Sequence, residues 1–483
     1  MPETFTPPDV RAGRLSAAQY ALRFADATPR LTQAQAVLEA ERCLYCYDAP
    51  CATACPTSID VPSFIKRIAD GNLRGSATTI LDSNPLGGMC ARVCPTENLC
   101  EAVCVKVAQE GKPIAIGKLQ RHAVDALMQS ERPQVFTRAP GTGKKIAVVG
   151  AGPAGLACAY SLARLGHDVV IFDANPKPGG LNEYGLASYK TPDNFAQREV
   201  AWLLGIGGIT IKNDYKLEST AQLDALRQDY DALFLGMGLA STHQLGVAGE
   251  GLAGVQDAVE FIATLRQTAD LSKLPVGRRV VVIGGGMTAV DASVQSALLG
   301  AENVHMVYRR GPGTMSASTA EQEWAQTNGV TIHHCLVPVE MVPASGQPGH
   351  VGGVKFAKQA VVDGQWHATG EFEVIQADMV LKAIGQKLGN PLLIEAGFTL
   401  EGGRIATDAA GQTSLQGVWA GGDCRAGGQD LTVEAVASKA PTRSGWHPRH
   451  PQTRPTTSTV RLKRAGAVWS GRQWARRVHR LSM

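Results

Sequence analysis

Apolar residues recur with two different periods along the chain, and the change between them divides it into two parts. Up to about residue 140 they follow short helical repeats, as over 33–42, 61–70 and 116–128, with no long alternating pattern. Beyond residue 145, runs of consecutive apolar residues precede Gly-rich turns and amphipathic stretches, which is typical of buried parallel strands and their helices. The pattern predicts a helical N-terminal domain, a Gly- and Pro-rich linker at 138–144, and a larger α/β part.

The first α/β segment contains a glycine turn between a predicted strand and a predicted helix. Gly150, Gly152 and Gly155 have the spacing of the dinucleotide-binding turn. Asp173 ends the next apolar run, at the distance where a carboxylate meets a ribose hydroxyl. Strand, turn, helix and acid together predict a nucleotide site in which the helix N-terminus faces a pyrophosphate.

A second unit of the same kind begins about 135 residues further on. Gly284, Gly286 and Ala289 repeat the turn spacing, but the following strand ends in Arg309 and Arg310 rather than in an acid. Paired arginines suit the 2′-phosphate of NADP. Two such units indicate two bound nucleotides, with one domain inserted in the other.

The bulk composition is that of an ordinary soluble globular protein. The 483 residues leave room for several domains, and 44% are hydrophobic while 19% are charged. The start lacks a basic segment followed by an apolar one, and the most apolar stretch, 146–165, contains three glycines and a proline. We therefore expect no secretory signal, no membrane span and a cytoplasmic location.

Residues 439–483 differ from the rest of the chain. They contain two lysines, nine arginines and no acid, whereas the whole chain has a net charge of +4, so the remainder carries −7. A terminal helix is expected here to complete the first nucleotide domain, yet no clean periodicity is present. We interpret this atypical basic tail as out of frame or divergent, with a disordered tail or a nucleic-acid-binding arm as alternatives.

Eight of the eleven cysteines fall within 62 residues, in two groups of four. They are Cys43, Cys46, Cys51, Cys55, Cys90, Cys94, Cys100 and Cys104. The run that ends in Cys55 and a proline resembles the bacterial ferredoxin pattern, in which the last cysteine binds the other cluster. The spacing predicts iron–sulfur clusters and one-electron chemistry. Zinc and disulfides are the alternatives, but only one C-x2-C pair is present and disulfides require an oxidising compartment.

The order of these motifs resembles a known family. A twin-cluster helical domain followed by GAGPAG, GGGMTAVDAS and AGGD…LTVEAV is similar to the flavoprotein subunit of bacterial NAD-dependent dihydropyrimidine dehydrogenases over about 35–438. It is also similar to the small subunit of glutamate synthase and to the N-terminal half of the animal dihydropyrimidine enzyme. The resemblance implies an α/β fold in which a helical domain precedes two Rossmann-like domains, the NAD(P) domain being inserted in the FAD domain.

The resemblance also implies the ligands of two [4Fe-4S] clusters. One cluster is held by Cys43, Cys46, Cys51 and Cys104, and the other by Cys55, Cys94, Cys100 and Gln120. In the dihydropyrimidine enzymes a glutamine supplies this last ligand, whereas glutamate synthase subunits tend to have an acid there. Gln120 therefore favours the pyrimidine branch, and Cys90 is the alternative fourth ligand.

The nucleotide contacts follow from the same resemblance. For FAD they are Gly150, Gly152, Gly155, Asp173, Gly180, Leu181, Lys190, Gly422, Asp423, Thr432 and Val433. For NAD(H) or NADP(H) they are Gly285, Gly286, Thr288, Arg309, Arg310, Ala383, Ile384 and Gly385. The arginine pair favours NADP(H), but Ser316 stands where the NADP-using animal enzyme has another arginine and the bacterial subunits use NAD. We expect NAD(H).

The expected organisation is a helical cluster domain at 1–140, an FAD domain at 145–270 and 376–438, an NAD(P) domain at 275–375 and the basic tail. By resemblance, the chain oxidises NAD(P)H through FAD and passes electrons through the clusters to an FMN-containing partner that reduces uracil or thymine. The small subunit of glutamate synthase, or another partner-specific reductase, is the first alternative. A cofactor-bearing scaffold or nucleic-acid binder is the second, although an acidic body argues against it.

Overall fold

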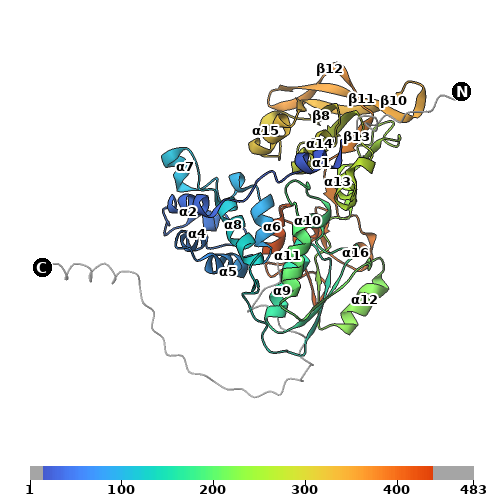
Figure 1. The fold of residues 1–483 in the computed structure, drawn as a ribbon. Helices are drawn as coiled ribbons and strands as arrows, with labels where there is room; N and C mark the ends of the chain where they lie inside the picture. The colour runs from blue at the N-terminus through green and yellow to red at the C-terminus, as the bar shows by residue number, and fades with distance from the viewer. Residues whose placement is uncertain (1–14, 439–483) are drawn as a thin grey trace, which may run out of the picture. The chain divides into compact units, whose positions relative to one another are not determined.

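The computed structural model describes residues 15–438, so the basic tail and the terminal helix expected there lie outside the described residues. The N-terminal part is helical, as predicted, with short helices joined by loops (Figure 1). They are α2 (Gln33–Glu41), α3 (Pro50–Thr53), α4 (Val61–Ala69), α5 (Leu73–Ser83), α6 (Gly87–Val93), α7 (Val105–Glu110) and α8 (Ile116–Met128).

The helices form where apolar spacing and capping residues coincide. In α8 the side chains of Leu119, Ala123 and Leu127 recur on one face and are buried. Helix α4 begins after Asp60, whose carboxylate accepts the backbone N–H of Ser63 and so satisfies one of the open amides. The buried faces share one hydrophobic core with the first nucleotide-binding sheet.

The first sheet is parallel, with strand order β17-β4-β1-β2-β3. Its strands are β1 (Lys145–Val149), β2 (Asp168–Phe172), β3 (Ile209–Lys212), β4 (Ala232–Leu235) and β17 (Val418–Ala420). Helices α9 (Pro153–Arg164), α11 (Phe195–Leu204) and α12 (Thr220–Asp229) connect them. Because β17 comes from the far end of the chain and pairs with β4, the intervening segment is an insertion.

The second sheet is also parallel, with order β6-β13-β7-β8-β9. Its strands are β6 (Val255–Asp257), β7 (Arg279–Ile283), β8 (Asn303–Tyr308), β9 (Val330–His334) and β13 (Met379–Lys382), with helices α13 (Ala258–Gln267), α14 (Met287–Leu298) and α15 (Thr319–Thr327). The sheet therefore includes strands on both sides of the expected range 275–375. The sequence did not indicate β6 and β13, because they are too short to show a hydrophobic period of their own. Helix α1 (Ala17–Arg23) packs here, where the Tyr20 hydroxyl donates to the Leu299 carbonyl at 3.4 Å.

A three-stranded antiparallel sheet was not expected from the sequence. It consists of β10 (Leu336–Ala344), β11 (Gln347–Val362) and β12 (Gln365–Gln376). Register shifts interrupt both strand pairs, for example between Pro338 and Glu340, so no regular alternation of apolar residues results.

The remaining elements are short. They are α10 (Leu181–Tyr184), α16 (Pro391–Glu395), α17 (Thr432–Ala437), β5 (Ser241–Thr242), β14 (Gln386–Lys387), β15 (Leu400–Glu401), β16 (Arg404–Ile405) and the 3-10 turns η2 (Thr96–Asn98), η3 (Leu271–Lys273), η4 (Pro312–Thr314) and η5 (Gly422–Cys424). The predicted fold class, a helical domain before two Rossmann-like units, is confirmed. Across 15–438, no helix has the length and apolar character needed to span a membrane.

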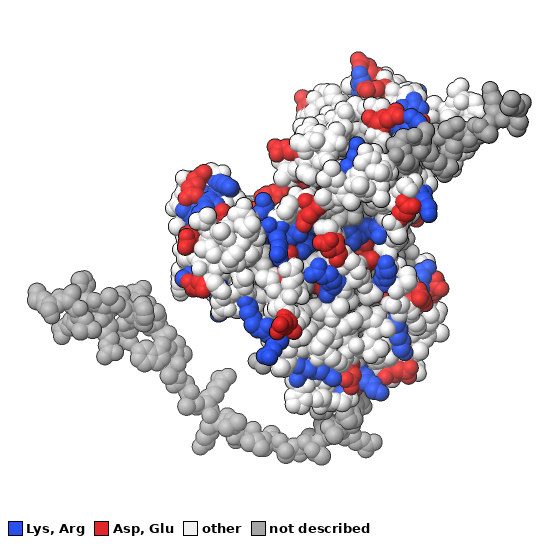
Figure 2. All heavy atoms as spheres, viewed as in Figure 1, with Lys and Arg blue, Asp and Glu red and all other residues white. Residues whose placement is uncertain are grey.

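Charge is mixed on the visible surface. Figure 2 shows Lys and Arg side chains interspersed with Asp and Glu over the face in view. Ion pairs among the described residues include Lys66–Asp70 and Arg164–Asp82. The described part of this face therefore presents no long basic stripe of the kind that follows a phosphate backbone.

Candidate functional site

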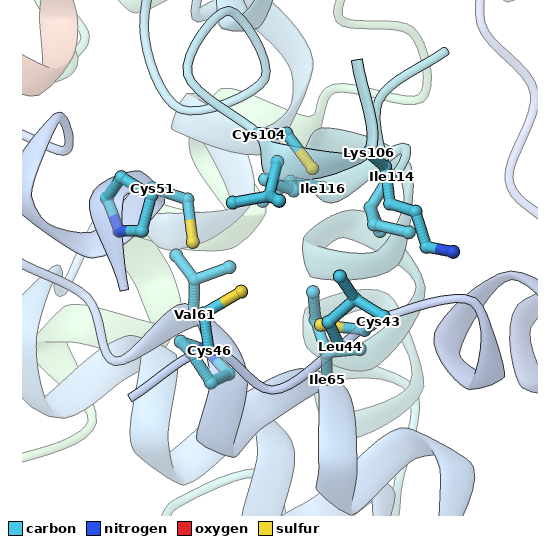
Figure 3. Close-up of a pocket in the computed structure, with 13 residues that line it drawn as sticks. Cys43, Leu44, Cys46, Cys51, Val61, Ile65, Cys104, Lys106, Ile114 and Ile116 are labelled. Carbon is cyan, nitrogen blue, oxygen red and sulfur yellow. The ribbon is translucent and has the colours of Figure 1, made fainter. Parts of the chain in front are cut away.

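Four cysteines surround one pocket in the helical domain. Cys43 and Cys46 lie in the loop after α2, Cys51 lies in α3, and Cys104 caps the start of α7. All four line the same pocket, and Figure 3 shows their sulfur atoms around a common space. This is the group predicted for the first cluster.

The backbone bends sharply to bring these thiols together. Tyr45 and Ala49 have positive φ angles of 50° and 38°. Residues other than glycine rarely adopt this backbone conformation, which is enriched at functional sites. The rest of the pocket wall is apolar, including Val61, Ile65 and Ile116. Burial raises the pKa of Cys51 to about 11, so a metal must displace the proton when it binds this thiol.

The thiols are spread around a space rather than gathered at a point. Across 15–438, no three or more His, Cys, Asp or Glu side chains lie close enough together to bind a single metal ion. All eleven cysteines fall in this range, and none of them forms a disulfide. Four thiolates around a wider space suit a group of several metal atoms, because each sulfur then meets a different corner of it.

A second group of thiols lies beside the first. Cys55 follows α3, Cys94 caps the end of α6, and Cys100 lies in the loop before α7. The pKa of Cys94 is raised well above its ordinary value, first by its hydrogen bond with Cys90 and then by burial, with Cys100 and Cys55 contributing further. The structure thus brings together the three cysteines predicted for the second cluster.

Of the two candidates for the fourth ligand of this group, Cys90 lies on α6 and Gln120 makes a hydrogen bond with α6. Gln120 is buried on α8, and its Nε2 donates to the Gly87 carbonyl at 2.7 Å. This bond occupies the amide nitrogen and leaves the amide oxygen, the atom that binds metals, for another partner. Cys90 is buried on α6 and lies next to Cys94. Either residue therefore remains a candidate.

The first glycine turn has the backbone that a bound pyrophosphate needs. Gly150 has φ 101°, and a Cβ on Gly155 would lie 1.9 Å from the Gly150 carbonyl oxygen. Gly152 caps α9 without a side-chain hydrogen bond, so the first amides of this helix stay open to an anion. The predicted turn forms and leads into the predicted helix, α9.

Asp173 lies at the turn, as predicted, and supports it. Its Oδ2 accepts the Ala151 backbone N–H at 2.6 Å and its Oδ1 accepts that of Asn175 at 2.8 Å. Each carboxylate oxygen keeps a further lone pair for a ribose hydroxyl. Gly180 also faces this turn, because a Cβ on it would lie 2.7 Å from the Gly152 Cα, and Leu181 begins α10 beside it.

Residues from the far end of the chain complete this site. Gly422 lies against α9, and burial raises the pKa of the adjacent Asp423 to about 6. The Thr432 hydroxyl donates to Asn182 Oδ1 at 3.0 Å, and Val433 is buried behind it in α17. The described residues give the buried Asn182 Nδ2 no partner.

These features fit FAD. Open helix amides, a tight glycine turn, a carboxylate and an unpaired buried donor are the groups that a dinucleotide with a polar ring system would satisfy. Sequence reasoning missed Asn182. Its position directly after Gly180 and Leu181 was the available signal.

The Lys190 side chain forms ion pairs with the second nucleotide domain. Its Nζ contacts Asp291 Oδ1 and Glu321 Oε1, each at 2.7 Å, on α14 and α15 of the second nucleotide domain. The Tyr189 hydroxyl donates to the same Asp291 at 3.2 Å. The contact of Lys190 with FAD stays a prediction, whereas its place in a buried ion cluster is observed.

The second glycine turn follows β7. Gly286 caps α14 without a side-chain hydrogen bond, and Thr288 lies in the first turn of that helix. A Cβ on Gly285 would lie 2.4 Å from the Tyr308 ring. The open amides again suit a pyrophosphate.

Two further predicted segments flank this turn. Arg309 and Arg310 are exposed directly after β8, where they can reach an anionic group on the ribose. The segment from Ala383 through Ile384 to Gly385 follows β13, and the Ala383 N–H donates to the Ile283 carbonyl at 2.8 Å. The structure therefore gathers all of the predicted nicotinamide-nucleotide residues at one end of the second sheet.

Comparison with known proteins agrees with this geometry. Residues 144–438 match the family described as pyridine nucleotide-disulphide oxidoreductase, and residues 21–132 match the one described as dihydropyrimidine dehydrogenase domain II, 4Fe-4S cluster. The second match covers both cysteine groups, and the first covers both glycine turns.

Two relatives represent the two branches that the motifs suggested. The chain is 36% identical over 313 residues to the NAD-dependent dihydropyrimidine dehydrogenase subunit PreT of Salmonella typhimurium, covering 65% of this chain and 74% of the relative. It is 34% identical over 437 residues to the glutamate synthase [NADPH] small chain of Escherichia coli, covering 86% and 92%. The resemblance drawn from the motifs is confirmed.

Among solved structures, FprA of Mycobacterium tuberculosis in complex with NADPH aligns with a TM-score of 0.51. The alignment covers 62% of this chain and 83% of that one at 20% identity, so it shows a shared fold.

Proposed function

The chain belongs to the pyridine nucleotide-disulphide oxidoreductase family and is an NAD(P)H-dependent flavin oxidoreductase, and on this premise we propose that it feeds a separate pyrimidine-reducing subunit. In this proposal it oxidises NADH, binds FAD and two [4Fe-4S] clusters, and delivers electrons to an FMN-containing partner. That partner reduces uracil or thymine to the dihydropyrimidine.

The observation that carries the proposal is the joint arrangement of thiols and flavin turn. Two groups of cysteines lie in one helical domain, and α6, which bears Cys90 and ends at Cys94, contacts both α11 and α17 of the FAD-binding domain. A two-electron site next to a chain of one-electron sites is the arrangement that converts a hydride into single electrons.

Each group of residues has a task in this conversion. The open amides of α9 and the carboxylate of Asp173 would hold the FAD diphosphate and ribose, while Thr432 and Asn182 would line the remainder of the cofactor site. When bound, FAD accepts a hydride and releases electrons singly. The amides of α14 would orient the diphosphate of the nicotinamide nucleotide, and Arg309 and Arg310, exposed after β8, would face a 2′-phosphate if one is present. Hydride transfer needs stacking and alignment, so no general acid or base is assigned.

The choice of the pyrimidine branch depends on two points. Gln120 donates a hydrogen bond to Gly87 of α6, the helix that ends at Cys94, and the resemblance implies that the dihydropyrimidine enzymes have a glutamine ligand at this position. Relatives named PreT, which are subunits of NAD-dependent dihydropyrimidine dehydrogenase, match the chain, and their name also supports NAD(H) and a partner subunit. The glutamate synthase relative supports the alternative, in which the partner is the large glutamate synthase subunit.

The test is reconstitution. The purified chain should contain FAD, iron and acid-labile sulfide for two clusters, and NADH should bleach its flavin. Uracil should be reduced only after the FMN-containing subunit is added. Uracil reduction by the chain alone would contradict the division of labour, and glutamate formation with the large glutamate synthase subunit would establish the alternative.

A further inference from the structure

A buried carboxylate joins the helix of the second thiol group to the flavin-binding domain. Glu199 lies on α11 and is fully buried. Its Oε1 accepts two backbone N–H groups at the start of α6, from Gly88 at 2.8 Å and from Met89 at 3.1 Å. Leu86, the residue that precedes α6, makes no capping bond with its side chain. Glu199 therefore caps a helix of another domain.

Apolar and cationic contacts strengthen the same junction. Met89, Phe195 and Ala196 form a small buried cluster between α6 and α11. The Arg92 guanidinium of α6 lies over the Phe195 ring, 3.4 Å from its centroid, and its Nη2 donates to both carboxylate oxygens of Asp125, at 2.8 and 2.9 Å. Helix α6 is thus held on one side by the helical domain and on the other by α11.

The junction is closely packed around Gly88. A Cβ on this residue would lie 2.5 Å from the Phe195 ring and 2.8 Å from Glu199 Oε1. Any shift of α6 along or away from α11 would break the two amide bonds. The same helix carries Cys90 and ends at Cys94, so its position sets the position of the second thiol group.

We propose that Glu199 is a positioning residue that fixes α6 against the flavin-binding domain and so sets the rate at which electrons leave the flavin for the second thiol group. This inference rests on the proposed function, which places a cluster at Cys94. The reductant is NADH, which gives up a hydride, and the cluster's iron gains one electron at a time. Glu199 itself neither gains nor loses an electron.

Burial has a second consequence for this residue. It raises the pKa of Glu199 to about 8, against the opposing effect of the Met89 and Gly88 amides and of Arg92. The neutral acid keeps a carbonyl oxygen that can accept both amide bonds. Glutamine has the same acceptor, whereas alanine has none, so the pair of substitutions separates the hydrogen bonds from the charge.

The test uses the cofactor-loaded chain and follows flavin and iron separately after rapid mixing with NADH. In Glu199→Ala, flavin reduction should stay within about twofold of normal, while the later reduction of iron should slow by about tenfold or more. Amide hydrogen exchange over 87–94 should accelerate in the same variant. Glu199→Gln should restore both properties. Gly88→Ala, which pushes Phe195 and Glu199 away, should reproduce the slow iron reduction.

Glu39→Ala is the matched control. Glu39 also accepts a backbone N–H at the start of another helix, that of Ala115 at 2.8 Å, but both elements lie in the helical domain. The inference fails if Glu39→Ala slows iron reduction as much as Glu199→Ala, or if Glu199→Ala changes neither rate nor exchange at full iron content. If the unmodified chain reduces its flavin but never its iron, the proposed function fails, and the exchange of α6 still decides the positioning role.

Discussion

The two glycine turns have similar backbone conformations and differ in the side chain that lies beside them. Strand pairing sets Val149 opposite Phe172 in the first sheet and Ile283 opposite Val307 in the second. One position further along, Asp173 lies beside the first turn and Tyr308 beside the second. The structural counterpart of the acid is therefore an aromatic residue, and the arginine pair begins one residue later.

This difference changes the chemistry of each turn. Asp173 binds the Ala151 amide and offers its other lone pairs to a ribose hydroxyl. The Tyr308 ring packs on Gly285, and its hydroxyl donates to the Thr314 carbonyl at 2.7 Å, which orders the loop that follows the arginines. The glycine spacing specifies a nucleotide turn, whereas the end of the neighbouring strand specifies which nucleotide it suits.

The largest effect is expected at the first turn. In Gly155→Ala the new methyl group would lie 1.9 Å from a backbone oxygen that cannot move without opening the turn. We expect loss of bound FAD and a decrease in unfolding free energy of roughly 2 kcal/mol or more, measured by flavin content and denaturant titration. Gly251→Ala is the control, because no atom lies within 4 Å of its Cβ position. Normal FAD content in Gly155→Ala would remove the pyrophosphate assignment.

The second turn should respond more mildly and selectively. In Gly285→Ala the methyl group meets the Tyr308 ring, a side chain that can give way. We expect an increase in KM for NADH of about tenfold, equivalent to about 1.4 kcal/mol, with FAD content unchanged. Steady-state kinetics with ferricyanide as acceptor measures this. In a Tyr308→Ala background the same substitution should cost less, and an equal cost would mean that the ring is not the obstacle.

The two turns also show why the sequence predicted some parts of the molecule better than others. Gly150 and Gly284 predict their turns, because glycine is the residue type that fits the positive φ angles of a turn with this spacing. Asn182 gave no comparable signal, since asparagine is common in turns and its role depends on Thr432, 250 residues away. The sequence did not predict the role of Glu199 either, because a carboxylate on an amphipathic helix is usually solvated.

The extent of the second sheet shows the same limit. Helix α8 was predicted over 116–128 and forms over those residues, because a long apolar repeat defines it. Strands β6 and β13 have three and four residues, and only their pairing with β7 and with each other assigns them to the inserted domain. Local periodicity cannot encode a partner, so this boundary needed the structure.

A smaller effect is expected at the arginines that follow Tyr308. Replacing Arg309 and Arg310 by alanine should raise KM for NADPH by about tenfold and change KM for NADH by less than about twofold, because only NADPH carries a 2′-phosphate. Arg278→Ala, at the other end of the sheet and paired with Glu302, is the matched control. Equal increases in KM for both nucleotides would show that Arg309 and Arg310 support the turn rather than bind the 2′-phosphate.

The smallest effect concerns Asp423, an acid that the first site has and the second lacks. Burial raises its pKa to about 6 in the folded chain, from an ordinary value of 3.8. Between these two values the folded state keeps a proton that the unfolded state has released, so the contribution of Asp423 to stability decreases as pH rises from about 4 to 6 and is constant above 6. Asp423→Asn should abolish this decrease and make the FAD-free chain more stable above pH 6 by roughly 1–3 kcal/mol. Thermal unfolding of both FAD-free proteins at pH 4, 5, 6 and 7 measures the difference. If the stability of the two proteins changes with pH in the same way, Asp423 is solvated and is not buried in the flavin site.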